Sequence, residues 1–218
     1  MMQPPFENRN RSMLRWWIIG SIAIVFAIGL IVVVNLPPPS PPPAPTQSSG
    51  SSTSNPKAPI LVEEYGDFQC PACGMFARGT LKQIQEKYVK NGTVKFVFHY
   101  FAFIGAESIR ASEAAECANE QGKFWEYYDA LYNHQAGENQ GAFSDDNLAN
   151  FAQQLELDMN RFNTCLQSDR YRDKVSADVA EGKARGVAQV PTLFINGQKS
   201  VGGISMAQFE ALIAPYLK

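Results

Sequence analysis

The chain has 218 residues, 45% of them hydrophobic and 18% charged, with a formal net charge of −2. This length and composition predict one globular domain together with additional segments. Residues 1–57 carry four basic residues and one acidic residue, whereas residues 58–218 carry 15 basic and 20 acidic residues. A mildly acidic folded part argues against nucleic acid as a partner.

An uncharged run of 21 residues, Trp16–Leu36, follows three arginines near the N-terminus. Such a run is long enough to cross about 30 Å of hydrocarbon as a helix. Because the arginines precede it, residues 1–15 are expected in the cytoplasm. A cleaved signal peptide is the alternative, but the run is long for one, and prolines follow it instead of a small-residue cleavage site. We therefore expect an uncleaved, single-pass membrane anchor, and an exported globular domain in either case.

Residues 37–57 contain eight prolines and many serines. This composition predicts a stiff polyproline II segment followed by a flexible coil. The segment is therefore interpreted as a linker that holds the globular domain, residues 58–218, near the membrane.

The motif with the clearest chemistry is Cys70-Pro71-Ala72-Cys73, between a strand-like run at 59–65 and a helical pattern that extends to about residue 90. A CxxC motif at the start of a helix is typical of a redox-active dithiol. Free backbone N–H groups and the helix dipole there stabilise a thiolate at Cys70. Cys73, one turn later, is placed to resolve a mixed disulfide.

Zinc binding and a purely structural disulfide are the alternative interpretations of this motif. Zinc would need a second close pair of ligands, whereas Cys117 and Cys165 are isolated and His99 and His134 show no ligand spacing. A disulfide that closes a four-residue loop constrains little of the unfolded chain. Redox chemistry is preferred, and the sequence predicts neither a metal site nor a cofactor.

The globular domain is predicted to contain a small mixed α/β sheet. A second strand is expected at 93–101, parallel to the first because a helix connects them. Two short strands are expected at 190–195 and 198–201, joined by Asn196-Gly197, a strong hairpin signal. A last amphipathic helix is expected at 206–217.

The segment from about 106 to 186 has five helical patterns, which is too long for a simple crossover and predicts a helical insertion. Ser144 and Asp158 are expected to cap two of its helices. An aromatic stripe in the insertion is interpreted as core packing and not as a ligand site. It comprises Phe124, Trp125, Tyr128 and Tyr132.

The CxxC motif, the helical insertion, and Val190-Pro191-Thr192 before a strand together resemble the DsbA-like thiol:disulfide oxidoreductases of the thioredoxin superfamily. The resemblance covers residues 59–218 and is closest to membrane-anchored bacterial members. It implies a cis peptide bond between Val190 and Pro191 beside the dithiol, with Val190 offering backbone groups to an extended substrate peptide. An ordinary trans proline at a strand start is the alternative.

Glu64 lies six residues before Cys70 and matches the buried acid of thioredoxin-like proteins. In that role it would relay a proton to or from Cys73 when a mixed disulfide resolves. Strand alternation places it on one face of the first strand and Glu63 on the other. A surface carboxylate is the alternative.

The resemblance also implies a second, structural disulfide between Cys117 and Cys165, which fall in two separate predicted helices. An oxidising exported compartment favours such a bridge. Two free buried thiols and a second redox relay are the alternatives.

The resemblance implies an extracytoplasmic enzyme that introduces disulfides into exported, reduced proteins. A membrane partner of the DsbB or vitamin K epoxide reductase type would reoxidise it. The family's strongest oxidants carry His between the two cysteines, and the Pro71-Ala72 dipeptide implies a milder oxidant. A reductase or isomerase kept reduced by a membrane electron donor, and a non-catalytic peptide-binding or chaperone module, are the alternatives.

Overall fold

The computed structural model describes residues 55–217. The predicted membrane anchor at Trp16–Leu36 and nearly all of the predicted linker at 37–57 lie outside these residues. Within 55–217, no helix combines the length and the apolar character that crossing a membrane requires.

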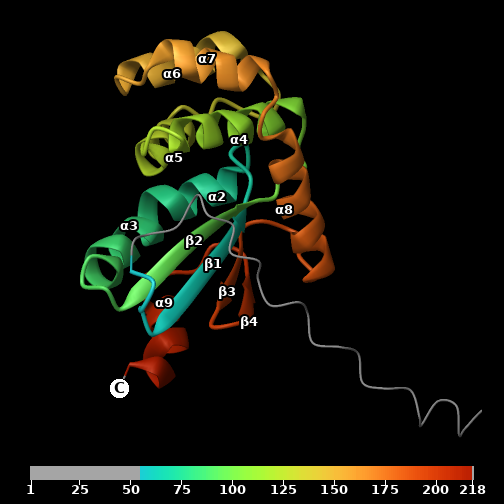
Figure 1. Cartoon of the computed structure of the whole chain (residues 1–218). Helices are drawn as coiled ribbons and strands as arrows, with labels where there is room; N and C mark the ends of the chain where they lie inside the picture. The colour runs from blue at the N-terminus through green and yellow to red at the C-terminus, as the bar shows by residue number, and fades with distance from the viewer. Residues whose placement is uncertain (1–54, 218) are drawn as a thin grey trace, which may run out of the picture. The chain divides into compact units, whose positions relative to one another are not determined.

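Four strands form one mixed sheet in the order β2-β1-β3-β4 (Figure 1). The strands are β1 (Ile60–Gly66), β2 (Val94–Tyr100), β3 (Thr192–Ile195) and β4 (Gln198–Val201). β1 and β2 are parallel, as the connecting helix predicted, and β3 pairs antiparallel with both β1 and β4. The central strand β1 is therefore hydrogen-bonded along both edges, and its carboxyl end leads directly into the CxxC motif.

The predicted hairpin joins β3 to β4. Its two turn residues both have positive φ, 46° at Asn196 and 84° at Gly197, as a tight two-residue connection requires. The Asn196 side chain accepts a hydrogen bond from the backbone N–H of Leu61 at 2.8 Å. This contact ties the hairpin to the start of β1 and fixes where β3 ends.

Helices cover both faces of the sheet. One continuous helix follows β1, and its segments are α2 (Pro71–Phe76), the π-helical η1 (Ala77–Leu81), α3 (Lys82–Ile84) and the π-helical η2 (Gln85–Val89). It shares its face with α9 (Met206–Ile213), because Tyr88 packs on Phe209 with 5.8 Å between ring centroids. Because Pro215 interrupts the predicted last helix, its final residues form a 3-10 turn, η3 (Ala214–Tyr216).

The helical insertion contains the five helices that the sequence predicted. They are α4 (Ala106–Asn119), α5 (Phe124–Asn133), α6 (Asp145–Gln154), α7 (Met159–Gln167) and α8 (Arg172–Ala184). Ser144 and Asp158 cap α6 and α7, as predicted. Figure 1 shows α4 and α5 between the sheet and the outer pair α6 and α7, whereas α8 descends to cover the second face of the sheet.

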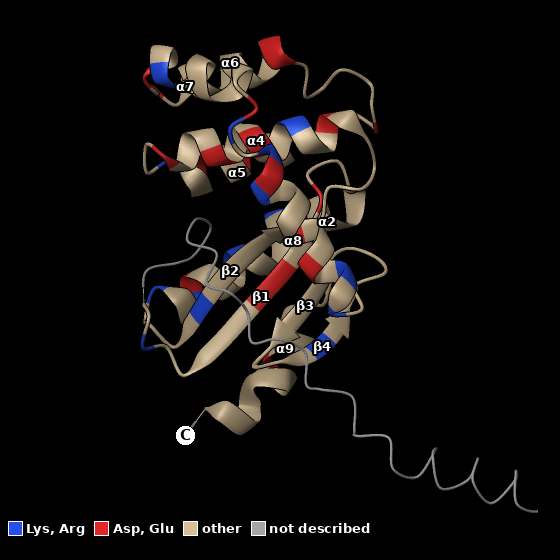
Figure 2. Cartoon of the chain, turned by 45° about the vertical axis from the view of Figure 1, so that its right-hand side comes forward, with Lys and Arg blue, Asp and Glu red and all other residues tan. Residues whose placement is uncertain are grey.

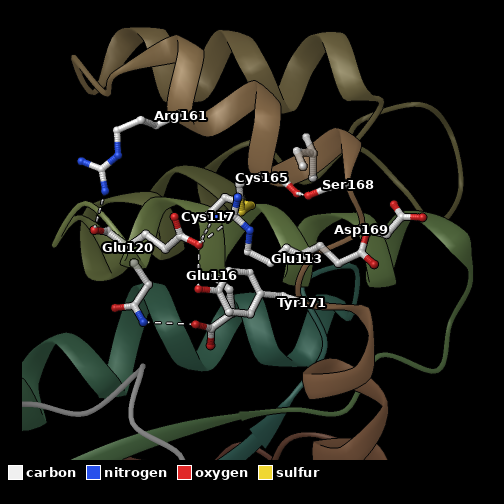
Figure 3. Close-up of a disulfide and its surroundings, with 12 residues drawn as sticks. Glu113, Glu116, Cys117, Glu120, Arg161, Cys165, Ser168, Asp169 and Tyr171 are labelled. Carbon is white, nitrogen blue, oxygen red and sulfur yellow. Dashed lines mark hydrogen bonds and ion pairs between the residues drawn. A yellow bond between two sulfur atoms is a disulfide. The ribbon is translucent and has the colours of Figure 1, made fainter.

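A disulfide joins Cys117 of α4 to Cys165 of α7, with an S–S distance of 2.02 Å (Figure 3). Both cysteines are buried. Glu120, next to the bridge, accepts hydrogen bonds from Arg170 at 2.6 Å and from the Tyr171 hydroxyl at 2.8 Å. The bridge and this network together connect the two helical layers to the start of α8.

Candidate active site

Cys70 occupies the N-cap of α2, where the chain turns out of β1. Its backbone is extended, and Pro71 takes the first helical position, where a missing N–H costs nothing. Cys70 is 8% exposed and Cys73 is fully buried, and both are free thiols. The helix start therefore presents one sulfur near the surface and holds the second beneath it.

The pKa values of the two thiols are shifted in opposite directions. A hydrogen bond from the Cys73 thiol, helped by the backbone N–H groups of Cys73 and Ala72, outweighs burial and lowers the pKa of Cys70 to about 6. Burial raises the pKa of Cys73 well above its ordinary value, and the hydrogen bond to Cys70 and the charge of Glu64 add to this. At neutral pH the arrangement favours a thiolate at Cys70 and a protonated thiol at Cys73.

The peptide bond between Val190 and Pro191 is cis. The Val190 carbonyl oxygen lies 3.7 Å from the Cys70 sulfur, although 120 residues separate the two in the sequence. The Pro191 carbonyl accepts a hydrogen bond from the Gly202 N–H at 2.7 Å. The backbone just before β3 therefore lies beside the reactive sulfur and is hydrogen-bonded to the chain that follows β4.

Glu64 is fully buried at the carboxyl end of β1, so the alternative of a surface carboxylate is wrong. Its Oε2 accepts a hydrogen bond from the Tyr128 hydroxyl at 3.3 Å. Within the described part of the chain, Oε1 has no hydrogen-bond partner. Burial raises the pKa of Glu64 to about 8, and the hydrogen bond from Tyr128 only partly offsets this.

A family model described as Thioredoxin matches residues 49–214. The chain belongs to the thioredoxin family. A Bacillus anthracis protein named "Probable disulfide bond formation protein D" is 30% identical over 186 residues, which are 83% of this chain and 86% of that protein. The protein of the same name from Bacillus cereus is 29% identical over 195 residues, 87% of this chain and 90% of that one.

Solved structures share the fold. Oxidised BdbD from Bacillus subtilis superposes with a TM-score of 0.74 at 22% identity, over 79% of this chain and 95% of that chain. Reduced DsbA from Mycobacterium tuberculosis superposes with a TM-score of 0.65 at 24% identity, over 77% of this chain and 92% of that chain. A segment making up 23% of the Na(+)/H(+) antiporter NhaA 1 of Salinispora arenicola is also 31% identical to 72% of this chain. The family, the relatives and the fold identify a DsbA-like protein thiol:disulfide oxidoreductase.

One carboxylate that sequence reasoning missed anchors the active-site turn of this oxidoreductase. Asp67 Oδ1 accepts hydrogen bonds from the Gln69 N–H at 2.8 Å and the Ser108 hydroxyl at 2.6 Å. Its Oδ2 accepts from the N–H groups of Phe103 and Ile104 at 3.0 and 3.2 Å. Asp67 thus joins the turn before Cys70 to α4 and to the loop after β2.

Gln135, in the loop after α5, holds the same turn from the other side. Its amide donates to the carbonyls of Phe68 and Cys70 at 2.7 and 3.0 Å. Gly74 makes room for it, because a β-carbon at that position would overlap the Gln135 and Arg78 side chains. No motif contains Gln135, so the sequence carries no signal for this contact.

The opposite face of β1 carries a separate charged cluster. Arg185 donates two hydrogen bonds to Glu63, both at 2.9 Å, and His99 Nε2 lies 3.2 Å from Glu63 Oε1. In Figure 2, α8 lies in front of the acidic stretch of β1. Among residues 55–217, no group of three or more His, Cys, Asp or Glu side chains has an arrangement able to hold a metal.

Proposed function

We propose that this oxidoreductase introduces disulfide bonds into exported proteins outside the cytoplasm, exchanging with substrate through Cys70. The observation that carries the proposal is the asymmetry of the two thiols, with the pKa of Cys70 lowered to about 6 and that of Cys73 raised. A thiolate stabilised in the reduced enzyme favours transfer of the enzyme disulfide to a substrate. The relatives named as disulfide bond formation proteins support the same direction.

The exchange begins with a substrate thiolate attacking the Cys70 sulfur of the oxidised enzyme. The bond between Cys70 and Cys73 breaks, and its electron pair goes to Cys73 while a mixed disulfide forms at Cys70. Glu64 is protonated at neutral pH because its pKa is about 8, and it supplies the proton that Cys73 takes up. The substrate's second thiolate then attacks its own bonded sulfur, and Cys70 leaves as a thiolate.

Val190 and Pro191 serve as the binding edge for the substrate. The Val190 carbonyl lies 3.7 Å from the Cys70 sulfur, so a peptide paired with this backbone would pass over the reactive atom. Pairing through backbone groups accepts many sequences, which suits an enzyme that acts on unfolded chains.

The proposed location is the outer side of the membrane, with Trp16–Leu36 as the anchor and a membrane enzyme of the DsbB or vitamin K epoxide reductase type as the oxidant. The uncharged run and the arginines before it support this placement. The likeness to part of a membrane antiporter is consistent with domains of this type working beside membranes.

A reductase or isomerase is the second candidate, favoured by the alanine at position 72. Its side chain adds neither a hydrogen bond nor a charge to the thiolate, so the reduced form is stabilised only by Cys73 and backbone groups. Either direction uses the same two sulfurs.

The redox state of the full chain in the cell separates the two candidates. Trapping with a thiol reagent is expected to find Cys70 and Cys73 mainly as a disulfide, whereas a mainly dithiol state would show a reductase. In a purified assay, the wild-type full chain should oxidise a reduced, unfolded test protein, and Cys70→Ser should abolish this. Equal activity of wild type and Cys70→Ser would overturn the proposal.

A further inference from the structure

Tyr128 belongs to the core aromatic stripe of α5, yet its hydroxyl reaches out of the helical insertion to Glu64 on β1. The two side chains are fully buried, and the O–H donates to Glu64 Oε2 at 3.3 Å. Glu64 Oε1 has no hydrogen-bond partner among residues 55–217. One carboxyl oxygen is therefore held by the insertion, and the other is left free inside the protein.

Tyr128 differs from the other titratable groups near the Glu64 carboxyl. The titratable groups near the carboxyl are Cys70 and Cys73 of the active-site turn, and Tyr128 and Tyr132 of α5. Tyr132 directs its hydroxyl elsewhere, to the Asp67 carbonyl at 3.4 Å.

The two strands beside β1 add no further polar side chain next to Glu64. Phe98 of β2 and Leu193 of β3 are its register neighbours. Tyr128 is consequently the single described side chain that donates a hydrogen bond to the Glu64 carboxyl.

We propose that Tyr128 is a positioning residue for disulfide exchange, which fixes Glu64 Oε2 so that Oε1 stays available to pass a proton to and from Cys73. This inference rests on the proposed function, since it concerns the step in which Cys73 leaves. In that step the Cys70–Cys73 bond breaks, the electron pair stays on Cys73, and the proton moves from Glu64 to the Cys73 sulfur. Tyr128 keeps its own proton, because burial raises the pKa of its hydroxyl well above the ordinary value.

The contact also sets how strongly Glu64 holds its proton. A hydrogen bond donated to a carboxylate stabilises the charged form and so lowers its pKa. Without the Tyr128 hydroxyl, Glu64 would bind its proton more tightly and release it to Cys73 less readily. Loss of one hydrogen bond of ordinary strength corresponds to a shift of roughly 0.5 to 1 pH unit.

The test is the pH profile of single-turnover reduction of the Cys70–Cys73 disulfide by a reduced thiol peptide, using the purified full chain. We expect wild type to show an inflection that Glu64→Gln removes. Tyr128→Phe should move this inflection up by roughly 0.5 to 1 unit and slow the reaction at neutral pH. In the Glu64→Gln background, Tyr128→Phe should change nothing further.

Tyr127→Phe is the matched control, because Tyr127 is equally buried on the same helix but donates to the Leu148 carbonyl at 2.8 Å. It should leave the inflection in place. If Tyr128→Phe does not fold, 3-fluorotyrosine at position 128 keeps the shape, is a stronger donor, and should move the inflection down.

Two results would overturn the inference while leaving the proposed function intact. The first is a pH profile of exchange that is the same in wild type and in Glu64→Gln. The second is a pH profile that is the same in Tyr128→Phe and in Tyr127→Phe. A wild-type chain that does not exchange with thiols at all would instead remove the proposed function, and the inference with it.

Discussion

Glu63 and Glu64 are consecutive residues of the same strand, and they meet opposite environments. Both are buried, at 2% and 0% exposure, and strand alternation turns them to opposite faces of the sheet. Burial alone would raise both pKa values. For Glu63, hydrogen bonds and charges from His99 and Arg185 outweigh burial and lower the pKa to about 2, whereas burial dominates at Glu64 and raises its pKa to about 8.

The difference comes from the helices that cover each face. The end of α8 brings Arg185, which forms a two-pronged ion pair with Glu63 and also lies over the Phe194 ring at 4.0 Å. The other face receives the CxxC turn and α5, which offer Glu64 one phenol hydroxyl and no positive charge.

A buried carboxylate with charged partners stays ionised, and its removal destabilises the fold, whereas one left partly unpartnered costs stability and retains a proton to exchange. The second type marks functional sites because perturbed acids of this kind are what proton transfer needs. We therefore expect the α8 face to contribute mainly to stability and the α5 face to take part in the proposed chemistry.

The largest expected effect is the loss of stability in Glu63→Gln. The substitution leaves the buried Arg185 with the more distant Glu181 carboxylate, at 3.8 Å, as a counter-charge, and breaking a buried pair in this way costs about 3 to 5 kcal/mol. Urea unfolding of the full chain should show this at pH 7, while the exchange rate of the folded protein stays near wild type. A variant that keeps its stability but loses its exchange rate would show that the α8 face takes part in the chemistry.

The stability lost in Glu63→Gln should become smaller as the pH falls. The pKa of Glu63 is lower in the folded protein than in the unfolded chain, so its contribution is present above about pH 4.5 and is lost as the pH falls toward 2. The stability gap between wild type and Glu63→Gln should therefore narrow by about 3 kcal/mol as the pH falls from above 4.5 to about 2.

Glu64→Gln should raise the stability of the fold, by less at pH 7 than Glu63→Gln lowers it. The pKa of Glu64 is raised in the folded protein, so unfolding releases its proton between about pH 4.5 and 8 and wild-type stability falls across this window. Glutamine has no proton to release, so the stability of the reduced variant should rise relative to wild type by a little over about 1 kcal/mol per pH unit, reaching about 3 kcal/mol at pH 7 and about 4 kcal/mol near pH 8.

Thermal and urea unfolding of the reduced full chain from pH 5 to 8 measure this gain, with Glu63→Gln as the matched control. The exchange rate should fall in Glu64→Gln even though stability rises. Parallel pH slopes for wild type and Glu64→Gln would mean that Glu64 ionises normally in the folded protein.

Features fixed by local rules were predictable from the sequence. The strand pair, the Asn196-Gly197 turn and the helix caps at Ser144 and Asp158 follow from the period of apolar residues and from turn and cap chemistry, and the structure has all of them. Alternation separated the faces of Glu63 and Glu64 but left a surface carboxylate open for Glu64, and the structure shows that it is buried. The π-helical segments of the helix after the CxxC motif were not predicted.

Long-range polar partners were not predictable, because periodicity shows which face of an element is buried but not what meets it there. The sequence pattern predicted that Tyr128 packs in the core, and its burial confirms this. Its hydroxyl, however, donates a hydrogen bond to Glu64, which lies 64 residues earlier in the chain. Glu63 was placed on the second face of β1, but nothing in the pattern pointed to Arg185, 122 residues later. The fold brings these side chains together through packing of the insertion, which no local rule describes.

Arg185→Lys is the mildest change to the α8 face and the sharpest check on why Glu63 is satisfied. Lysine keeps the positive charge but loses the two-pronged geometry, the contact with the Tyr65 hydroxyl at 3.0 Å and the stacking on Phe194. We expect a loss of about 1 to 2 kcal/mol, well below that of Glu63→Gln. Arg170→Lys is the control, since the solvent-exposed ion pair of Arg170 with Glu120 should contribute little to stability. If Arg185→Lys instead lowers stability as much as Glu63→Gln does, the geometry of the hydrogen bonds, and not the balance of charge, keeps Glu63 ionised. The contrast between Glu63 and Glu64 would then come from the number of hydrogen bonds that each accepts.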